Sequence, residues 1–253
     1  MKRLENKVAI ITGSSRGIGA EIAKSFALQG AHIVINYKDS YDAATKTMAD
    51  INNLAPNVKV IIIQADVSLR SDVKRLFEET ISKLGKIDIL VNNAGINKRG
   101  FFDEVTDDDW DLILSTNLKG PFICSQEVFP YMEKQGGGRI INISSVAGQY
   151  HGPKTVHYAV SKAGLNSLTK VTARYGAPIN ILVNAVAPGI IKTDQTADEI
   201  ESEAGKRVID MTLLKKPGRF EDICSACLML ASDEQQYMTG QILAVSGGAI
   251  IDN

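Results

Sequence analysis

The feature that most constrains the fold is a regular alternation between short apolar runs and longer segments with helical periodicity. The apolar runs are rich in β-branched residues and mostly lack strict apolar–polar alternation, which is typical of parallel strands covered on both faces. We expect strands at Val8–Thr12, His32–Asn36, Val58–Gln64, Ile87–Asn92, Arg139–Ser144, Ile179–Ala187 and Gln241–Val245. Helical periodicity occupies residues 17–29, 41–54, 70–84, 107–134, 155–175 and 220–231. This order predicts an α/β fold of the Rossmann type, a doubly wound parallel sheet of about seven strands with helices on both faces.

The composition fits one globular domain. The chain has 253 residues, 44% of them hydrophobic and 23% charged, and no repeat, low-complexity tract or linker marks a second domain. We expect a single domain over residues 1–253, whose least regular part, near 189–216, would lie beside the ligand crevice as a lid. A formal net charge of -1 gives no reason to expect a nucleic acid or an anionic membrane as partner. Because no signal region or membrane-spanning stretch is found, we expect a cytoplasmic location.

The cysteine pattern was tested against a metal or redox site. Three cysteines are an odd number, which argues against a disulfide framework. Cys224 and Cys227 form a C-x-x-C within a predicted amphipathic helix, with both thiols on its apolar side. The chain has no second cysteine pair and its three histidines are scattered, so we predict core packing and no metal site.

A glycine-rich turn follows the first predicted strand. Thr12–Gly19 has the spacing G-x-x-x-G-x-G and leads directly into a helix, although the common dinucleotide fingerprint is G-x-G-x-x-G. Glycines allow a sharp turn and a close backbone approach, and the helix start favours a pyrophosphate. The predicted cofactor contacts in this turn are Gly13, Ser15, Arg16, Gly17, Ile18 and Gly19.

The end of the second strand bears on the choice between NAD and NADP. An acidic residue there would bind the ribose 2′-hydroxyl, whereas basic residues accommodate a 2′-phosphate. The strand end carries Asn36, Tyr37 and Lys38, and Arg16 can reach the same phosphate. Asp39 is the counter-argument, but we place it beyond the strand in the loop. We therefore favour NADP(H) over NAD(H), against the alternative that Lys38 and Arg16 are solvated surface charges.

A tyrosine and a lysine four residues apart form the candidate catalytic pair. Tyr158 and Lys162 share one face of a predicted helix. A free tyrosine has a pKa near 10, and a neighbouring ammonium stabilises the phenolate and lowers that pKa. Upstream, the strand Arg139–Ser144 ends in hydroxyl residues at the carboxyl edge of the sheet, where ligands bind in this fold.

Taken together, the motifs resemble the short-chain dehydrogenase/reductase family over almost the whole chain. The resemblance rests on Thr12–Gly19, Asp66-Val67, Asn92-Asn93-Ala94-Gly95, Asn117, Ser145, Tyr158 with Lys162, and Pro188-Gly189. It implies an NADP(H)-dependent oxidoreductase acting on a carbonyl or secondary alcohol, with four catalytic residues. Tyr158 would be the general acid or base, and Lys162 would lower its pKa and hold the nicotinamide ribose. Ser145, thirteen residues before Tyr158, would bind the substrate oxygen, and Asn117 would position a water of a proton relay.

The resemblance also implies further cofactor contacts. Asp66 and Val67 would contact the adenine, and Asn93, Ala94 and Gly95 would lie along the cofactor. Near the nicotinamide we expect Pro188, Gly189, Ile190 and Thr193. Without the resemblance, Asn92–Gly95 reads as a tight turn, Asp66 as a helix cap and Pro188-Gly189 as a strand terminator. His151 is a candidate substrate contact, whereas we interpret His157 as incidental and Trp110 as helix packing.

The substrate is less well defined. The overall pattern is similar to bacterial 3-oxoacyl-[acyl-carrier-protein] reductases and to related sugar, polyol or alcohol dehydrogenases. An acidic carrier protein would favour basic residues around the cleft. Arg174 is a possible docking residue, but uncharged Gly136–Gly138 and Ile179 weaken this assignment. A non-catalytic NADP(H)-binding sensor and a thiol-redox protein are the alternatives from other classes.

The resemblance implies a homotetramer. Related proteins usually assemble through the two long helices near 107–134 and 155–175 and through the last strand. The turn after that strand carries Ser246 where the family more often has Asp.

Overall fold

The computed structural model describes residues 2–150, 154–192 and 200–250. Its sheet has seven strands, all parallel, in the order β3-β2-β1-β4-β5-β6-β7. The strands are β1 (Val8–Ile11), β2 (His32–Tyr37), β3 (Val60–Gln64), β4 (Ile89–Asn92), β5 (Gly138–Ile143), β6 (Ile181–Pro188) and β7 (Ile242–Val245). The doubly wound parallel sheet expected from the sequence is confirmed, with strand ends within two residues of those expected.

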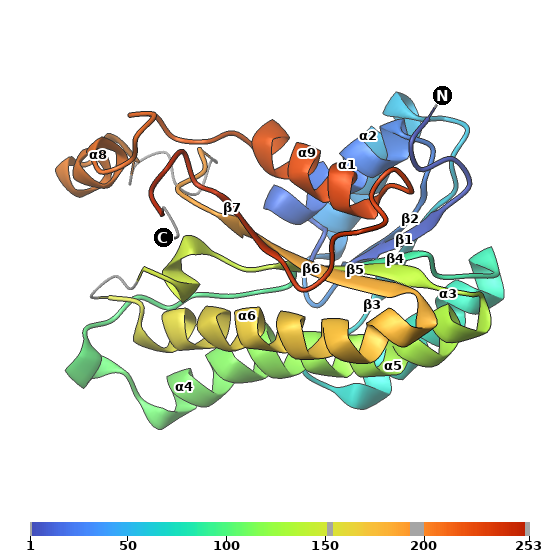
Figure 1. Ribbon diagram of the computed structural model, residues 1–253, viewed down its shortest axis with the longest axis horizontal. Coiled ribbons are helices and arrows are strands. Elements are labelled where there is room, and N and C mark those ends of the chain that lie inside the picture. Colours follow the sequence, from blue (N-terminus) through green and yellow to red (C-terminus); the bar gives the residue numbers. More distant parts are fainter. Residues whose placement is uncertain (1, 151–153, 193–199, 251–253) are drawn as a thin grey trace.

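Helices cover both faces of the sheet (Figure 1). On one face lie α1 (Gly17–Leu28), α2 (Tyr41–Leu54) and α9 (Phe220–Ala231). On the other lie α3 (Arg70–Leu84), α5 (Gly120–Lys134) and α6 (Val156–Gly176). Short 3-10 turns, η1 (Phe102–Glu104), η3 (Val146–Gly148) and η4 (Ala177–Ile179), punctuate the connections.

The strands are apolar on both faces because both faces are covered. In β1 every residue is buried, and the neighbours Ile10 and Ile11 pack into the clusters on opposite sides of the sheet. Complete burial of a side chain of this size contributes about 1.5–3 kcal/mol. The right-handed crossovers of such a sheet place its ligand-binding loops at the carboxyl ends of the strands.

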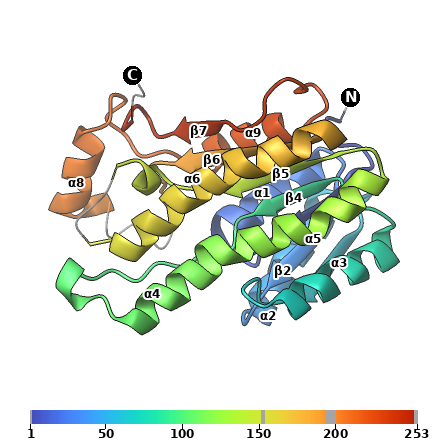
Figure 2. The ribbon, with the colours of Figure 1, turned by 60° about the horizontal axis from the view of Figure 1, so that its bottom comes forward.

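The long segment 107–134 is not one continuous α-helix. It consists of α4 (Asp107–Leu114), a π-helical turn η2 (Ser115–Lys119), and α5, which run on from one another (Figure 2). Pro121 lacks the N–H that a continuous helix would donate to the carbonyl of Asn117, which favours the wider turn at this point. Such π turns occur often at functional sites, and this one contains Asn117.

The segment expected to be irregular near 189–216 contains a short helix, α8 (Glu203–Asp210). Ser202 caps it, its Oγ accepting a hydrogen bond from the Gly205 N–H at 3.1 Å. In Figure 1, α8 projects beyond the end of the sheet where β6 and β7 terminate. No helix among the described residues has the length and apolar character needed to cross a membrane.

Candidate active site

The glycine-rich turn connects β1 to α1 at the carboxyl edge of the sheet. Gly13 and Gly17 both have φ of +62°, which favours glycine. A Cβ at Gly13 would lie 2.8 Å from the Cα of Ala94, so only glycine allows the β1 loop to pack this closely on the loop after β4. Arg16 precedes α1 and makes no side-chain cap, so no capping side chain occupies the start of α1.

Two asparagines tie the glycine turn to neighbouring loops. The Asn36 Oδ1 accepts a hydrogen bond from the Gly13 N–H at 3.1 Å, and its Nδ2 donates to the Ala65 carbonyl oxygen at 3.1 Å. The Asn93 Nδ2 donates to the carbonyl oxygens of Thr12, at 2.9 Å, and Gly13, at 3.1 Å. Asn36 is 1% exposed, so its amide holds the turn in shape. The turn is therefore fixed before any ligand arrives.

Two predicted cofactor residues, Lys38 and Asp66, form an ion pair. Their Nζ and Oδ2 atoms lie 2.8 Å apart at the ends of β2 and β3. The hydrogen bond to Asp66 raises the pKa of Lys38. Burial opposes ionisation of Asp66, but hydrogen bonds from Lys38 and Ser68 lower its pKa. Lys38 thus stays charged and is directed towards this edge of the sheet, on which exposed Arg16 also lies.

The catalytic candidates Ser145, Tyr158 and Lys162 are brought together from β5 and α6. Ser145 precedes η3, where its Oγ accepts a hydrogen bond from the Ala147 N–H at 3.1 Å. Its hydroxyl also forms a hydrogen bond with the Tyr158 side chain. The Lys162 Nζ lies 5.6 Å from the centroid of the Tyr158 ring.

The pKa values differ from the sequence expectation. We expected Lys162 to lower the pKa of Tyr158, but burial raises it, and the hydrogen bond from Ser145 only partly opposes that rise. The Lys162 Nζ donates instead to the Ile143 carbonyl oxygen at 2.8 Å. Burial lowers the pKa of Lys162 to about 8. Burial therefore adds to the preference of Tyr158 for its protonated form, which a free tyrosine already holds at neutral pH.

Asn117 lies beside the lysine. Its Oδ1 accepts from the Ile96 N–H at 2.9 Å, and its Nδ2 donates to the Ile96 carbonyl oxygen at 2.8 Å and to the Ser161 Oγ at 3.2 Å. A Cβ built on Gly95 would lie 3.4 Å from the Asn117 Oδ1 and 3.6 Å from the Lys162 Nζ. The β4 loop, η2 and α6 therefore meet at one point, with all four catalytic candidates along this edge.

The remaining cofactor candidates lie at the same edge. Gly189 follows β6, donates its N–H to the Val245 carbonyl oxygen at 2.9 Å, and packs against Ser246, whose Cα would be 2.8 Å from an added Cβ. Val67 is buried against Gly120. Pro188 and Ile190 flank Gly189, and Gly19 contacts Asn93. Thr193 and His151 lie outside the described residues.

Other residues singled out in the sequence have structural positions. His157 is buried, and its Nδ1 accepts a hydrogen bond from the Tyr158 N–H at 2.9 Å. Trp110 lies on α4 with 36% of its surface exposed. Cys224 and Cys227 are buried, as predicted, and burial raises the pKa of Cys224 to about 12 and also raises that of Cys227. Across the described residues no group of three or more His, Cys, Asp or Glu could hold a metal ion.

One buried pair was missed by the sequence reasoning. The Ser144 Oγ donates to the Asn166 Oδ1 at 2.6 Å and lies 3.3 Å from the Lys162 carbonyl oxygen. These contacts tie α6 to the end of β5 at the level of Lys162. The signal was the doubled serine Ser144-Ser145, of which only the second was given a role.

Comparison with known proteins identifies the family. The family model described as short chain dehydrogenase matches residues 7–204. The chain belongs to the short-chain dehydrogenase/reductase family. It is 40% identical to the 3-oxoacyl-[acyl-carrier-protein] reductase FabG of Staphylococcus epidermidis over 243 residues, covering 96% of this chain and 98% of that protein. The corresponding FabG of Thermotoga maritima is 39% identical over 251 residues, or 98% of this chain and all of that one.

Solved structures of other short-chain dehydrogenases share the fold. A putative short-chain alcohol dehydrogenase from Sinorhizobium meliloti superposes with a TM-score of 0.92 at 34% identity, covering 97% of each chain. A gluconate 5-dehydrogenase from Burkholderia cenocepacia, in complex with NADP and tartrate, gives 0.91 at 34% identity over 98% of this chain and 96% of that one. As a short-chain dehydrogenase/reductase, the protein is an oxidoreductase that acts on CH–OH or C=O groups with a nicotinamide cofactor.

The residues at the carboxyl edge fit such a dinucleotide. A side chain at Gly13 would clash with Ala94, so bare backbone lines the turn, and the start of α1 carries no side-chain cap. Both features suit a pyrophosphate, which needs close approach and N–H donors.

Proposed function

We propose that this short-chain dehydrogenase/reductase is an NADP(H)-dependent reductase of 3-oxoacyl thioesters presented by an acyl carrier protein. The observation that carries the proposal is the cluster of Ser145, Tyr158, Lys162 and Asn117 at the edge of a fixed glycine turn. The FabG relatives at about 40% identity support this substrate class over the gluconate dehydrogenase at 34%.

In this proposal the tyrosine supplies the proton. A tyrosine is protonated at neutral pH and burial raises the pKa of Tyr158 further, so Tyr158 enters the reaction as a proton donor, as carbonyl reduction requires. Ser145 donates a hydrogen bond to the substrate oxygen and stabilises its developing charge. When bound, the nicotinamide supplies the hydride. Lys162 stabilises the phenolate that remains and binds the nicotinamide ribose, and Asn117 positions the water through which the proton is replaced.

The preference for NADP(H) rests on two cations. Lys38 and Arg16 lie at the end of β2 and before α1, where a 2′-phosphate is bound in this fold. β2 ends at Tyr37, so Asp39 lies in the following loop and does not occupy the position that selects the 2′-hydroxyl. Two structural relatives, both from Burkholderia cenocepacia, are complexes with NADP, which supports the same preference.

We further propose that the chain forms one catalytic domain that assembles as a homotetramer, with residues 189–216 as the substrate lid.

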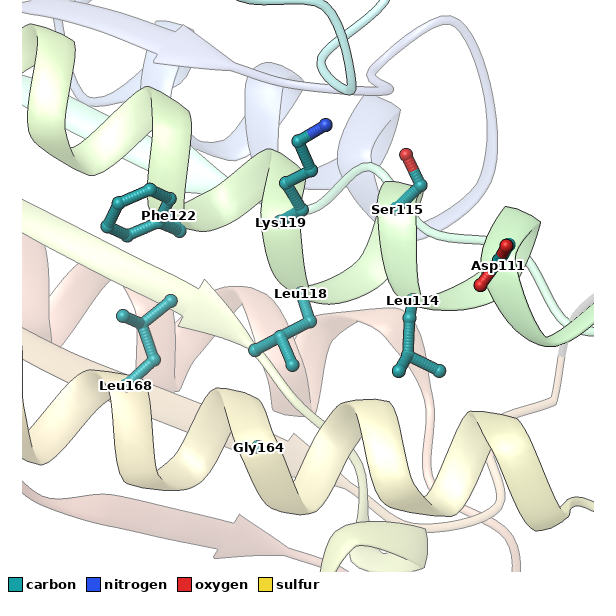
Figure 3. A pocket seen from close by; sticks show the side chains of 8 residues that line it. All are labelled: Asp111, Leu114, Ser115, Leu118, Lys119, Phe122, Gly164 and Leu168. Atoms are coloured by element: carbon teal, nitrogen blue, oxygen red, sulfur yellow. The ribbon is translucent and has the colours of Figure 1, made fainter.

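An apolar groove of about 710 Å³ lies between α6 and the α4–η2–α5 segment (Figure 3). Leu114, Leu118, Phe122 and Leu168 line it, together with the polar Asp111, Ser115 and Lys119. Such an apolar surface favours burial against a second copy. Light scattering tests this assembly, and Phe122→Asp should shift the mass towards smaller species.

The decisive experiment measures NADPH and NADH oxidation with acetoacetyl thioesters, simple ketones and sugar acids. Tyr158→Phe should lower turnover by about 10²- to 10⁴-fold, since it removes the proton donor while keeping the ring. Tyr175→Phe is the matched control, because Tyr175 is exposed on the same helix. Preference for NADPH and for thioesters would support the proposal.

Three results would contradict it. If Tyr158→Phe turns over substrate like the wild type, the catalytic assignment fails. If NADPH binds but the wild type turns over none of these substrates, a non-catalytic sensor becomes the better account. If sugar acids are reduced faster than acetoacetyl thioesters, the substrate class is wrong while the chemistry stands.

A further inference from the structure

We propose that a second site, at the opposite edge of the sheet, binds a small oxyanion of the phosphate class. A polar cavity of about 470 Å³ lies at the amino ends of β1, β4 and β5, away from the glycine turn. Its charged lining consists of Lys7, Lys86, Asp88, Arg139 and Asp233. The catalytic candidates are absent from this lining, so anion binding here is independent of the proposed function.

Arg139 places a cation in this cavity that is largely buried and has poor hydrogen-bond partners. Its side chain is 11% exposed. The Nη1 atom donates to the carbonyl oxygen of Gly138 at 3.2 Å, and Nη2 to that of Gln235 at 3.5 Å. Among the described residues, the buried Nε has no hydrogen-bond partner. Burial lowers the pKa of Arg139, so the surroundings disfavour its charge. A guanidinium cannot escape this cost by losing its proton.

The two nearby carboxylates are already engaged by other groups. Asp233 lies 3.9 Å from the Arg139 Nη2, beyond hydrogen-bond distance, and is held at 2.9 Å by the Lys7 Nζ. Asp88 accepts the Val8 N–H at 2.7 Å and pairs with Lys86 at 3.0 Å. Asp233 therefore offsets the charge of Arg139 only in part, through a long ion pair without a hydrogen bond, and Asp88 makes no ion pair with it.

The charges around the cavity define the class of ligand. Lys7, Lys86 and Arg139 carry three positive charges against two negative ones on Asp88 and Asp233, which leaves one cation in excess. Water can accept the remaining N–H bonds but brings no countercharge. A phosphate oxyanion does both, because its oxygens match the fork of a guanidinium and form short charge-assisted bonds.

The lining comes from segments that only the fold brings together. Lys7 precedes β1, Lys86 precedes β4, Arg139 lies in β5 and Asp233 follows α9. An unfolded chain does not present these groups together, so a bound anion stabilises the folded state in proportion to its affinity. Binding is therefore measurable as a rise in the thermal midpoint without any assay of turnover.

The test compares sodium phosphate with sodium chloride at equal ionic strength by differential scanning calorimetry and by isothermal titration. It is run on Arg16→Gln, so that the glycine turn contributes little phosphate binding, and on the full chain without that change. Phosphate should raise the thermal midpoint more than chloride does. Arg139→Gln should weaken phosphate binding by about 10- to 100-fold, the usual weight of a charge-assisted contact. A second titration, with a phosphate monoester, shows whether a free ion or a phosphorylated small molecule fits better.

Lys7→Gln and Lys86→Gln keep the test valid if Arg139→Gln fails to fold, because both lysines are more exposed than Arg139. Each should reduce phosphate binding severalfold. Arg219→Gln, an exposed arginine elsewhere on the surface, is the matched control and should bind phosphate like the parent. Equal phosphate and chloride effects, or equal binding by the cavity variants and Arg219→Gln, would overturn the proposal.

Discussion

Replacing Lys162 with methionine removes an ammonium group that the fold buries almost completely. Lys162 is 4% exposed, and its Nζ has the Ile143 carbonyl oxygen as an acceptor at 2.8 Å. Burial lowers its pKa from 10.5 to about 8. The folded chain therefore releases this proton at a lower pH than the unfolded chain, in which the lysine is solvated.

This difference sets the direction of a pH effect on stability. Between pH 8 and 10.5 the unfolded chain holds more of this proton than the folded chain, so the contribution of Lys162 to the free energy of unfolding rises with pH. Below pH 8 the full cost of the buried charge opposes folding, about 3 kcal/mol at ~1.4 kcal/mol per pH unit. About 2 kcal/mol of that cost disappears between pH 7 and about pH 9.5. The methionine variant lacks this dependence.

The measurement is urea denaturation followed by far-UV circular dichroism, without cofactor and at one protein concentration. The free energy of unfolding of the wild type, minus that of Lys162→Met, should rise by about 2 kcal/mol from pH 7 to about pH 9.5. Lys170→Met, which removes an exposed lysine of the same helix, should follow the wild type at every pH. A constant difference between wild type and Lys162→Met would refute the reasoning, because the buried ammonium would then carry no cost.

Three further predictions concern the cofactor, the helix anchor and the thiols. Lys38→Ala should weaken NADPH binding by roughly 10- to 100-fold and leave NADH nearly unchanged in fluorescence titrations; equal losses for both would remove the basis for NADP preference. Ser144→Ala should lower the free energy of unfolding by about 1–3 kcal/mol, since Asn166 loses its donor inside the protein; unchanged urea curves would contradict this. The folded chain should not react with Ellman's reagent at neutral pH, because burial raises the pKa of Cys124 and Cys224 to about 12; a fast-reacting thiol would revive a redox role.

The sheet could be predicted because its strands are buried on both faces and so read as continuous apolar runs. Two helical features could not be predicted from the sequence. The periodicity of 107–134 does not reveal one extra residue in a turn, although Pro121 was a visible signal. α8 has only two turns and contains Gly205, so its apolar face is too short to give the sustained periodic signal by which the longer helices were predicted.

At the candidate site, the motifs predicted which residue types meet at the carboxyl edge, but not how their side chains pair. The ion pair of Lys38 with Asp66 depends on β2 and β3 being neighbours, which only the sheet order determines. The pKa of Tyr158 was predicted in the wrong direction because spacing along a helix says nothing about burial. Lys162 is close in sequence, yet its ammonium is directed to the Ile143 carbonyl oxygen.

The π-helical turn η2 has a consequence for how the molecule can vary. A π turn accommodates one residue more than an α turn, and one residue corresponds to a rotation of about 100° along a helix. Deleting a single residue between Ser115 and Lys119 would therefore swing α4 and its Leu114 by that angle relative to α5. The shape of the apolar groove and the position of Asn117 both depend on the register of this turn. A change of length here therefore alters both together, whereas a point substitution can alter either one alone.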